Sequence, residues 1–220
     1  MVREANADLR EGMSLLPTEA VFGLKVDRLG PIRAGEFERW SQGEEDPLEL
    51  IEGWLLPMTP GTYDTGKVLG QLFSLLAPLV QAKGWSMSLD ARHRLPQPPD
   101  TVVFPDLVIH CAAEVSYAPG TETVARVPEI VVEILGRETA ARDRAPRGAK
   151  FLAYQMSGVQ EYYFAWPDGR GAAGFPRREG RFAAAPQEPD GFFASPLLGV
   201  ALRLVPAALR RPATSPSPAG

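Results

Sequence analysis

The sequence predicts an α/β domain in which helices pack on a mixed sheet, and three observations support this. Two apolar segments of strand length, 102–109 and 128–135, each contain an acidic residue between apolar neighbours, Asp106 and Glu133 respectively. A strongly periodic helical segment precedes them. A second helical segment and a β-prone run follow them. The predicted core order is helix, strand, strand, strand, helix, strand, as expected of a layered α/β fold.

Length, charge and cysteine content restrict the class of protein. The chain has 220 residues, enough for one domain with a sizeable core. We expect no membrane span, since no apolar stretch approaches ~18 residues, and segment 1–11 lacks an apolar signal-peptide core. The single cysteine, Cys111, excludes an internal disulfide and favours a cytoplasmic protein. The net charge of the chain is −4, so binding a nucleic acid would require a local basic patch on its surface.

Composition and patterning divide the chain into three regions. Residues 1–34 show little periodicity and are expected to form an N-terminal arm. Residues 35–205 hold the strongly patterned segments and are expected to form the domain. Residues 206–220 end in a run rich in Pro, Ser and Ala, so we expect a disordered C-terminal tail.

The first half of the domain predicts two helices and a hairpin. Segment 36–42 suits a helical turn or two, with two aromatic residues on one face. Segment 48–58 alternates around a glycine and predicts a strand or hairpin. Segment 64–83 is the strongest helix, because its apolar residues recur with a period of 3.6 and Gly84 follows as a stop. Asp64 or Thr65 is the candidate cap.

The second half predicts four strands and a second helix. The helix follows an arginine-rich stretch and ends near Ser157, with Gly158 suited to its C-cap. A polar loop is expected over 114–127, and a short hairpin with an irregular return over 170–205. The predicted strands cover residues 85–95, 102–110, 129–135 and 160–166.

Asp106 and Glu133 are the candidate functional residues of the apolar strands. Burying a carboxylate in such a strand costs several kcal/mol unless something pairs with it. A cation or an arginine could meet Glu133, or its strand end could open into a cleft. We infer that the two acids meet at a divalent metal. For Asp106 alone, a capping role at a strand end is the simpler alternative.

A hard cation such as Mg²⁺, or Mn²⁺ in its place, suits this pair of acids. Mg²⁺ is typically held by one or two carboxylates together with substrate phosphate. A nearby lysine would help to hold the nucleophile and the phosphate. Side chains two apart on a strand share a face, but the residue two after Glu133 is Leu135. The nearest candidate is Lys150 on the following helix, although a solvated helix lysine is the alternative.

Four arginines precede Lys150 and form the candidate nucleic-acid-binding patch. A local basic cluster is what a backbone-binding surface on an acidic protein would look like. A solvated face is the alternative reading. The four residues are Arg137, Arg142, Arg144 and Arg147.

Three segments carry a family resemblance: PDLVIH at 105–110, PEIVVEILGRET at 128–139 and KFLAYQMSGVQEYYFAWP at 150–167. In this order and spacing they resemble the Uma family of restriction endonucleases (DUF820-like), in the PD-(D/E)xK nuclease superfamily. The segment LELIEGWLLPMTP at 48–60 is similar to that family's N-terminal hairpin. The similarity covers about residues 35–205.

The resemblance implies a restriction-endonuclease-like αβββαβ core and Mg²⁺-dependent cleavage of nucleic-acid phosphodiesters, with DNA the first expectation. Asp106 matches the family's PD aspartate, and Glu133 matches the acid of its third core strand. Lys150 matches the family's helix lysine, so the implied catalytic set is Asp106, Glu133 and Lys150. Asp143 matches an aspartate before that helix. Many nucleases of this fold act as dimers, so a homodimer is possible.

Departures from the family pattern keep a second hypothesis open. The turn after Glu133 is Gly136-Arg137-Glu138-Thr139, and the histidine common near the start of the first core helix is absent. The alternative is a catalytically degenerate nuclease-fold protein that binds nucleic acid or protein. A hydrolase or transferase on another phosphate substrate ranks last, because there is no Gly-rich phosphate fingerprint. Glu49 or Glu52 could add a third acid, although hairpin glutamates are usually exposed.

Overall fold

The structure is a computed structural model, and it describes residues 31–41, 48–58, 61–136, 148–169 and 171–210. The chain divides into two units, Met1–Pro31 and Ile32–Gly220, and every element below belongs to the second. Among the described helices, none combines the length and the apolar character that crossing a membrane requires.

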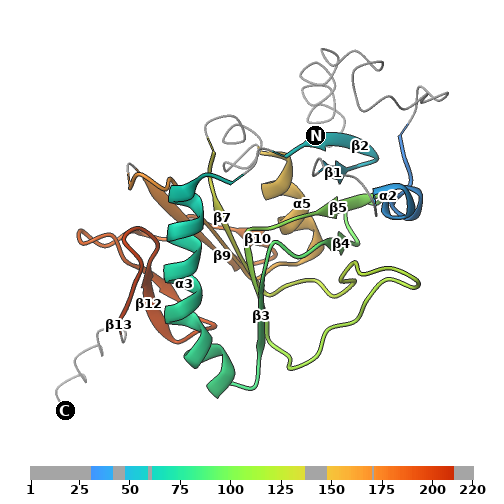
Figure 1. The fold of residues 1–220 in the computed structure, drawn as a ribbon. Helices are drawn as coiled ribbons and strands as arrows, with labels where there is room; N and C mark the ends of the chain where they lie inside the picture. Colours follow the sequence, from blue (N-terminus) through green and yellow to red (C-terminus); the bar gives the residue numbers. More distant parts are fainter. Residues whose placement is uncertain (1–30, 42–47, 59–60, 137–147, 170, 211–220) are drawn as a thin grey trace. The chain divides into compact units, whose positions relative to one another are not determined.

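A mixed six-stranded sheet forms the centre of the second unit (Figure 1). Its strand order is β10-β9-β8-β7-β6-β3, and β7 and β8 form its parallel pair. The apolar segments from which strands were predicted form the middle of this sheet. Strands buried on both faces need apolar residues throughout. The bounds are β3 Ser86–Leu89, β6 Leu107–His110, β7 Ile130–Ile134, β8 Glu161–Ala165, β9 Ala172–Arg178 and β10 Arg181–Phe182.

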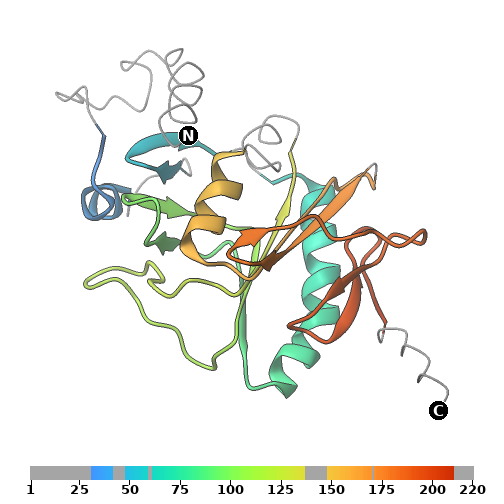
Figure 2. The ribbon, with the colours of Figure 1, turned by 180° about the vertical axis from the view of Figure 1, so that it is seen from behind.

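Two helices lie on opposite faces of this sheet, as the front and back views show (Figures 1 and 2). Helix α3 (Tyr63–Ala82) buries its apolar stripe against β3, β6 and β7. Thr62 caps it, since its hydroxyl accepts from Thr65 N at 3.2 Å, so the cap lies before the predicted Asp64 or Thr65. Helix α5 (Ala149–Ser157) connects the parallel strands β7 and β8 and ends at Gly158, whose φ of 97° confirms the predicted C-cap.

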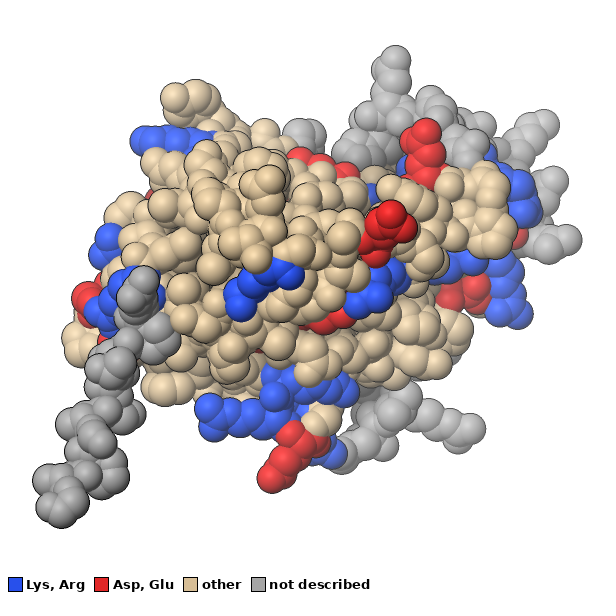
Figure 3. Space-filling view, turned by 90° about the horizontal axis from the view of Figure 1, so that it is seen from below, with Lys and Arg blue, Asp and Glu red and all other residues tan. Residues whose placement is uncertain are grey.

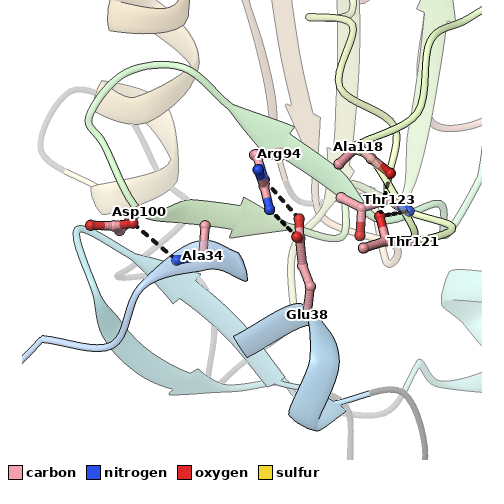
Figure 4. A network of polar contacts seen from close by, with 7 residues as sticks. All are labelled: Ala34, Glu38, Arg94, Asp100, Ala118, Thr121 and Thr123. Atoms are coloured by element: carbon pink, nitrogen blue, oxygen red, sulfur yellow. Dashed lines mark hydrogen bonds and ion pairs between the residues drawn. The ribbon is translucent and has the colours of Figure 1, made fainter. Parts of the chain in front are cut away.

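A four-stranded sheet with the order β2-β1-β5-β4 contacts α5 through β1 and β4. It consists of β1 (Leu48–Ile51), β2 (Trp54–Pro57), β4 (His93–Leu95) and β5 (Thr101–Val103). The predicted hairpin at 48–58 is confirmed as β1 and β2. Helix α2 (Ala34–Trp40) is attached to this sheet by polar contacts (Figure 4). Ala34 N donates to Asp100 Oδ1 at 2.9 Å, and Arg94 Nε donates to Glu38 Oε1 at 2.8 Å.

Two predicted strands are wrong in the same way, because each is divided between two sheets. Segment 85–95 forms β3 in the large sheet and β4 in the small one. Segment 102–110 likewise forms β5 and β6, so Asp106 lies between two strands and not inside one. The breaks have local causes: Asp90 has a left-handed φ of 48°, and Pro105 cannot donate to a strand ladder.

The C-terminal region is more regular than its sequence indicates. A three-stranded sheet of β11 (Phe193–Ser195), β12 (Val200–Arg203) and β13 (Ala208–Arg210) replaces the expected irregular return. Strand β13 also lies inside the segment expected to be a disordered tail. It pairs with β12 and contacts α3, which gives it the support that its composition does not predict.

Candidate active site

Strand β7 points its residues alternately at the two helices, and this alternation positions Glu133. Ile130, Val132 and Ile134 belong to the apolar cluster that packs with α3. Because successive side chains on a strand point to opposite faces, Glu133 faces the other side, where α5 lies. Its side chain is only 3% exposed. The predicted burial of an acid in this strand is therefore confirmed.

Helix α5 supplies two partners for the buried glutamate. Lys150 and Tyr154 are four residues apart and share one face of the helix. Lys150 Nζ lies 2.8 Å from Glu133 Oε1, and Tyr154 OH donates to the same oxygen at 2.7 Å. Burial, together with the negative charge of Glu133, raises the pKa of Tyr154 well above its ordinary value. Tyr154 therefore stays protonated and acts as a donor.

Glu49 joins this cluster from strand β1 of the smaller sheet. Its Oε1 lies 2.9 Å from Lys150 Nζ and accepts from Phe104 N at 2.9 Å. The side chain is fully buried, contrary to the expectation that hairpin glutamates are exposed. A single acid flanked by Leu48 and Leu50 is the signal that identified Glu133, and it could have identified Glu49 as well. Glu52, in contrast, is in the turn, with a left-handed φ of 54°.

Asp106 immediately precedes β6 and lies beside Glu133. Leu107 pairs with Val132, so Asp106 and Glu133 occupy the next opposing positions. Asp106 Oδ2 accepts from Ile134 N at 2.5 Å, which fixes the carboxylate at the end of β7. The structure therefore brings Asp106, Glu133 and Lys150 to one place.

Asp90 is an acid at the same sheet edge that the sequence analysis did not single out. Leu89 pairs with Leu107, so Asp90 follows β3 opposite Asp106, and Asp90 N donates to Asp106 O at 3.3 Å. Burial raises the pKa of Asp90, and the positive charge of Lys150 partly opposes this rise. Asp90 could be identified as part of this cluster only from the register between β3 and β6. That register is known only once the two strands are seen to be neighbours.

The donor set suits a hard cation. Asp106 and Glu133 offer carboxylate oxygens, which Mg²⁺ and Mn²⁺ prefer over nitrogen and sulfur. Among the residues that the structure describes, no three Asp, Glu, His or Cys side chains are grouped closely enough to hold an ion by themselves. A cation with two carboxylate ligands plus substrate and water fits this arrangement.

The basic patch cannot be located in the same way. Arg137, Arg142, Arg144, Arg147 and also Asp143 lie outside the described residues. On the molecular face seen in Figure 3, basic and acidic side chains are scattered among uncharged ones and are not gathered into one basic surface.

Two buried histidines form a separate polar pair. His93 Nε2 and His110 Nε2 lie 3.1 Å apart, and the imidazole rings are stacked. Burial lowers the pKa of His93 to about 4 and also lowers that of His110, so both rings are neutral at physiological pH.

The helix–strand order and the acid cluster define a restriction-endonuclease-like fold. A crystal structure of a "putative nuclease belonging to DUF820" from Anabaena variabilis ATCC 29413 shares this fold. It matches with a TM-score of 0.61 and 18% identity, over 76% of this chain and 91% of that one. A family model, Uma2, described as "Putative restriction endonuclease", matches residues 34–205. The chain belongs to the Uma2 family, which confirms the resemblance inferred from its motifs. No curated protein matches it.

Proposed function

We propose that this protein is a metal-dependent nuclease that hydrolyses phosphodiester bonds in nucleic acid, with DNA as the first expectation. Membership of the Uma2 family supports a nuclease in general terms. The observation that carries the finer proposal is the buried ammonium of Lys150, which contacts Glu49 and Glu133 at 2.9 and 2.8 Å. A cluster of acids around one lysine is costly to bury, and active sites are where such clusters occur.

The residues divide into three roles in this proposal. Asp106 and Glu133 would hold Mg²⁺ or Mn²⁺, which supplies a bound water of lowered pKa and neutralises charge on the phosphate. Lys150 would orient the attacking water and stabilise the negative charge that develops on the phosphoryl oxygens. Glu49 and Tyr154 are positioning residues, because they contact Lys150 Nζ and Glu133 Oε1 respectively.

The alternative is a binding protein with a degenerate nuclease core. The altered turn after Glu133 favours it, since residues 136–139 depart from the family pattern. The two functions predict different results for one substitution. If the protein is a nuclease, Glu133→Gln should abolish cleavage. If it is a binding protein with a degenerate core, Glu133→Gln should leave the binding of its nucleic-acid or protein partner unchanged.

A cleavage assay tests the proposal directly. Wild type, Glu133→Gln, Lys150→Met and the surface control Glu188→Gln are incubated with supercoiled plasmid and with a single-stranded oligonucleotide, in Mg²⁺, Mn²⁺ or EDTA. We expect cleavage that EDTA abolishes, and a loss of about 100-fold or more in both site variants. The control should match wild type. Wild-type protein that cleaves neither substrate with either ion would favour the binding-only alternative.

A further inference from the structure

A large groove lies next to the acid cluster and is not explained by phosphodiester chemistry. Its volume is about 1790 Å³, above the ~300–1,000 Å³ of ordinary small-molecule pockets. Strand β3, at the edge of the six-stranded sheet, lines it with Ser86, Met87 and Ser88. Segment 113–124, in the long yellow-green loop of Figure 1, provides most of the remaining wall.

The loop wall is held in place by hydrogen bonds. Val124 N donates to Arg92 O at 2.8 Å, and Val124 O accepts from Arg94 N at 2.8 Å, which joins the loop to the start of β4. At the loop tip, Thr121 Oγ1 donates to Ala118 O at 3.0 Å and accepts from Thr123 N at 3.1 Å (Figure 4). The groove is therefore preformed, which lowers the entropy cost of binding.

The groove reaches the candidate active site through two of its lining residues. Phe104 lines it, and the backbone N of Phe104 donates to Glu49 Oε1 at 2.9 Å. Asp90 also lines it, and this residue follows β3 directly opposite Asp106. A polymer bound at Asp106 and Glu133 would therefore lie next to this groove.

The lining offers aromatic surface. Tyr117 lines the groove, and 58% of this residue is exposed to solvent. Phe104 also lines it, and the Arg92 guanidinium lies over the Phe104 ring at 5.0 Å from its centroid. Proteins hold unpaired bases by stacking them on aromatic rings and on arginine guanidinium planes.

The charge of the groove determines which part of a nucleic acid it suits. Its lining has one basic residue, Arg92, against the acids Asp90, Glu114 and Glu122. A duplex backbone needs several phosphate-neutralising cations, and this surface does not offer them. A single strand carries phosphates too, so only its uncharged bases suit this lining, and its phosphates must lie outside it.

We propose that the groove binds the unpaired bases of a single-stranded nucleic acid, with Tyr117 as a stacking platform, and so gives the enzyme a preference for single-stranded over duplex substrate. This inference rests on the proposed nuclease function and names its substrate class. The bases occupy the groove between β3 and the loop, while the phosphates lie toward the acids and the solvent.

Fluorescence anisotropy tests the inference without requiring cleavage. A labelled single-stranded DNA oligonucleotide is titrated with protein in Ca²⁺, and the duplex of the same sequence serves as competitor. The variants are Tyr117→Ala and Tyr117→Phe, and the control is Tyr63→Ala, which removes a tyrosine that is 86% exposed at the start of α3.

We expect tighter binding of the single strand than of the duplex. Tyr117→Ala should weaken single-strand binding by roughly ten- to a hundred-fold, the range of one lost base–aromatic stack. Tyr117→Phe and Tyr63→Ala should bind within about twofold of wild type, because the first keeps the ring and the second lies outside the groove.

Two results would overturn the inference, and they differ in what else they affect. If wild type binds the single strand but Tyr117→Ala and Tyr63→Ala bind it equally well, the groove does not hold bases, and an extended peptide paired with the β3 edge becomes the better occupant. The proposed nuclease would survive that result. If wild type binds neither DNA, the nucleic-acid substrate itself is wrong and both proposals fail.

Discussion

Two buried glutamates on neighbouring strands, Glu133 and Glu161, have different kinds of partner. Glu133 on β7 contacts the ammonium of Lys150 and the hydroxyl of Tyr154. Glu161 on β8 is 1% exposed, and its partners are all uncharged. Both acids are satisfied, but only the first is balanced by an opposite charge.

The Glu161 cluster connects the six-stranded sheet to the three-stranded one. Glu161 Oε2 accepts from Ser195 Oγ at 2.5 Å and from Tyr163 OH at 2.9 Å, while Oε1 accepts from Leu197 N at 2.7 Å. Burial raises the pKa of Glu161, and these hydrogen bonds partly oppose the rise. Such a set has a structural role, because its donors are uncharged and join two sheets.

The difference shows how a functional acid can be separated from a structural one. The Glu133 cluster brings Glu49, Asp106 and Lys150 together from separate elements, next to a groove. The charges of these side chains do not improve packing. The Glu161 cluster joins two sheets with neutral donors. Substitutions in the two clusters should therefore differ in their effects on stability and on metal binding.

The largest effect is expected from removing the negative charge around Lys150. Glu49→Gln combined with Glu133→Gln keeps acceptors for Phe104 N and Tyr154 OH but removes the two carboxylates that lie within 2.9 Å of the buried ammonium. Breaking a buried ion pair in this way costs about 3–5 kcal/mol. Urea unfolding measures the loss.

A triple variant tests the reason for that loss. Adding Lys150→Met to the two glutamine substitutions removes the buried charge and should restore much of the stability. If the triple variant is no more stable than the double one, uncompensated charge is not the cause.

Glu161→Ala should be the next most destabilising change. It leaves Ser195 Oγ, Tyr163 OH and Leu197 N without their shared acceptor, at about 2–4 kcal/mol in total. Metal binding by the folded protein should not change, and calorimetry with Mn²⁺ checks this. A loss of metal binding in a folded Glu161→Ala protein would remove the distinction between the two clusters.

Tyr154→Phe should cost about 1.5–3 kcal/mol, the value of one hydrogen bond to a charged group. The ring remains, so the packing of Tyr154 on Tyr162, with ring centroids 5.5 Å apart, should persist. Thermal unfolding measures the change. No loss of stability would mean that the 2.7 Å contact between Tyr154 OH and Glu133 has little net value.

The smallest effect is the part of the pH dependence of stability that Glu161 contributes. Its pKa in the folded state is raised above the ordinary 4.5, so the folded protein binds a proton more readily than the unfolded chain does. Its contribution to stability is full below about pH 4.5 and declines as the pH rises through the higher folded value. The difference in unfolding free energy between wild type and Glu161→Gln over this range should show that slope, because Asp90, whose pKa is also raised, is present in both proteins. Parallel curves would contradict the raised pKa.

The sequence predicted the core elements and most of the acid cluster. Periodicity was sufficient for α3, since its buried residues form one stripe along the helix, and an acid within an apolar run was sufficient for β7 and Glu133. The division of segment 85–95 between two sheets could not be predicted, because both halves have the same alternation and the break depends on the backbone at Asp90.

The roles of two further buried acids depend on contacts between distant segments. Glu49 reaches Lys150 only because β1 packs against α5, and this contact is not visible in either segment alone. Glu161 has the same sequence signature as Glu133, an acid in an apolar strand. Only the structure shows that its partners are neutral, so the signature locates buried acids but does not assign their roles.

Calorimetric titration with Mn²⁺ and Mg²⁺ tests the central claim most directly. Wild type is compared with Asp106→Ala, Glu133→Ala and, as the matched control, Glu161→Gln. The proposed site predicts that wild type and the control bind the ion and that both alanine variants lose it. Binding retained in both alanine variants would contradict the claim and would place any metal away from Asp106 and Glu133.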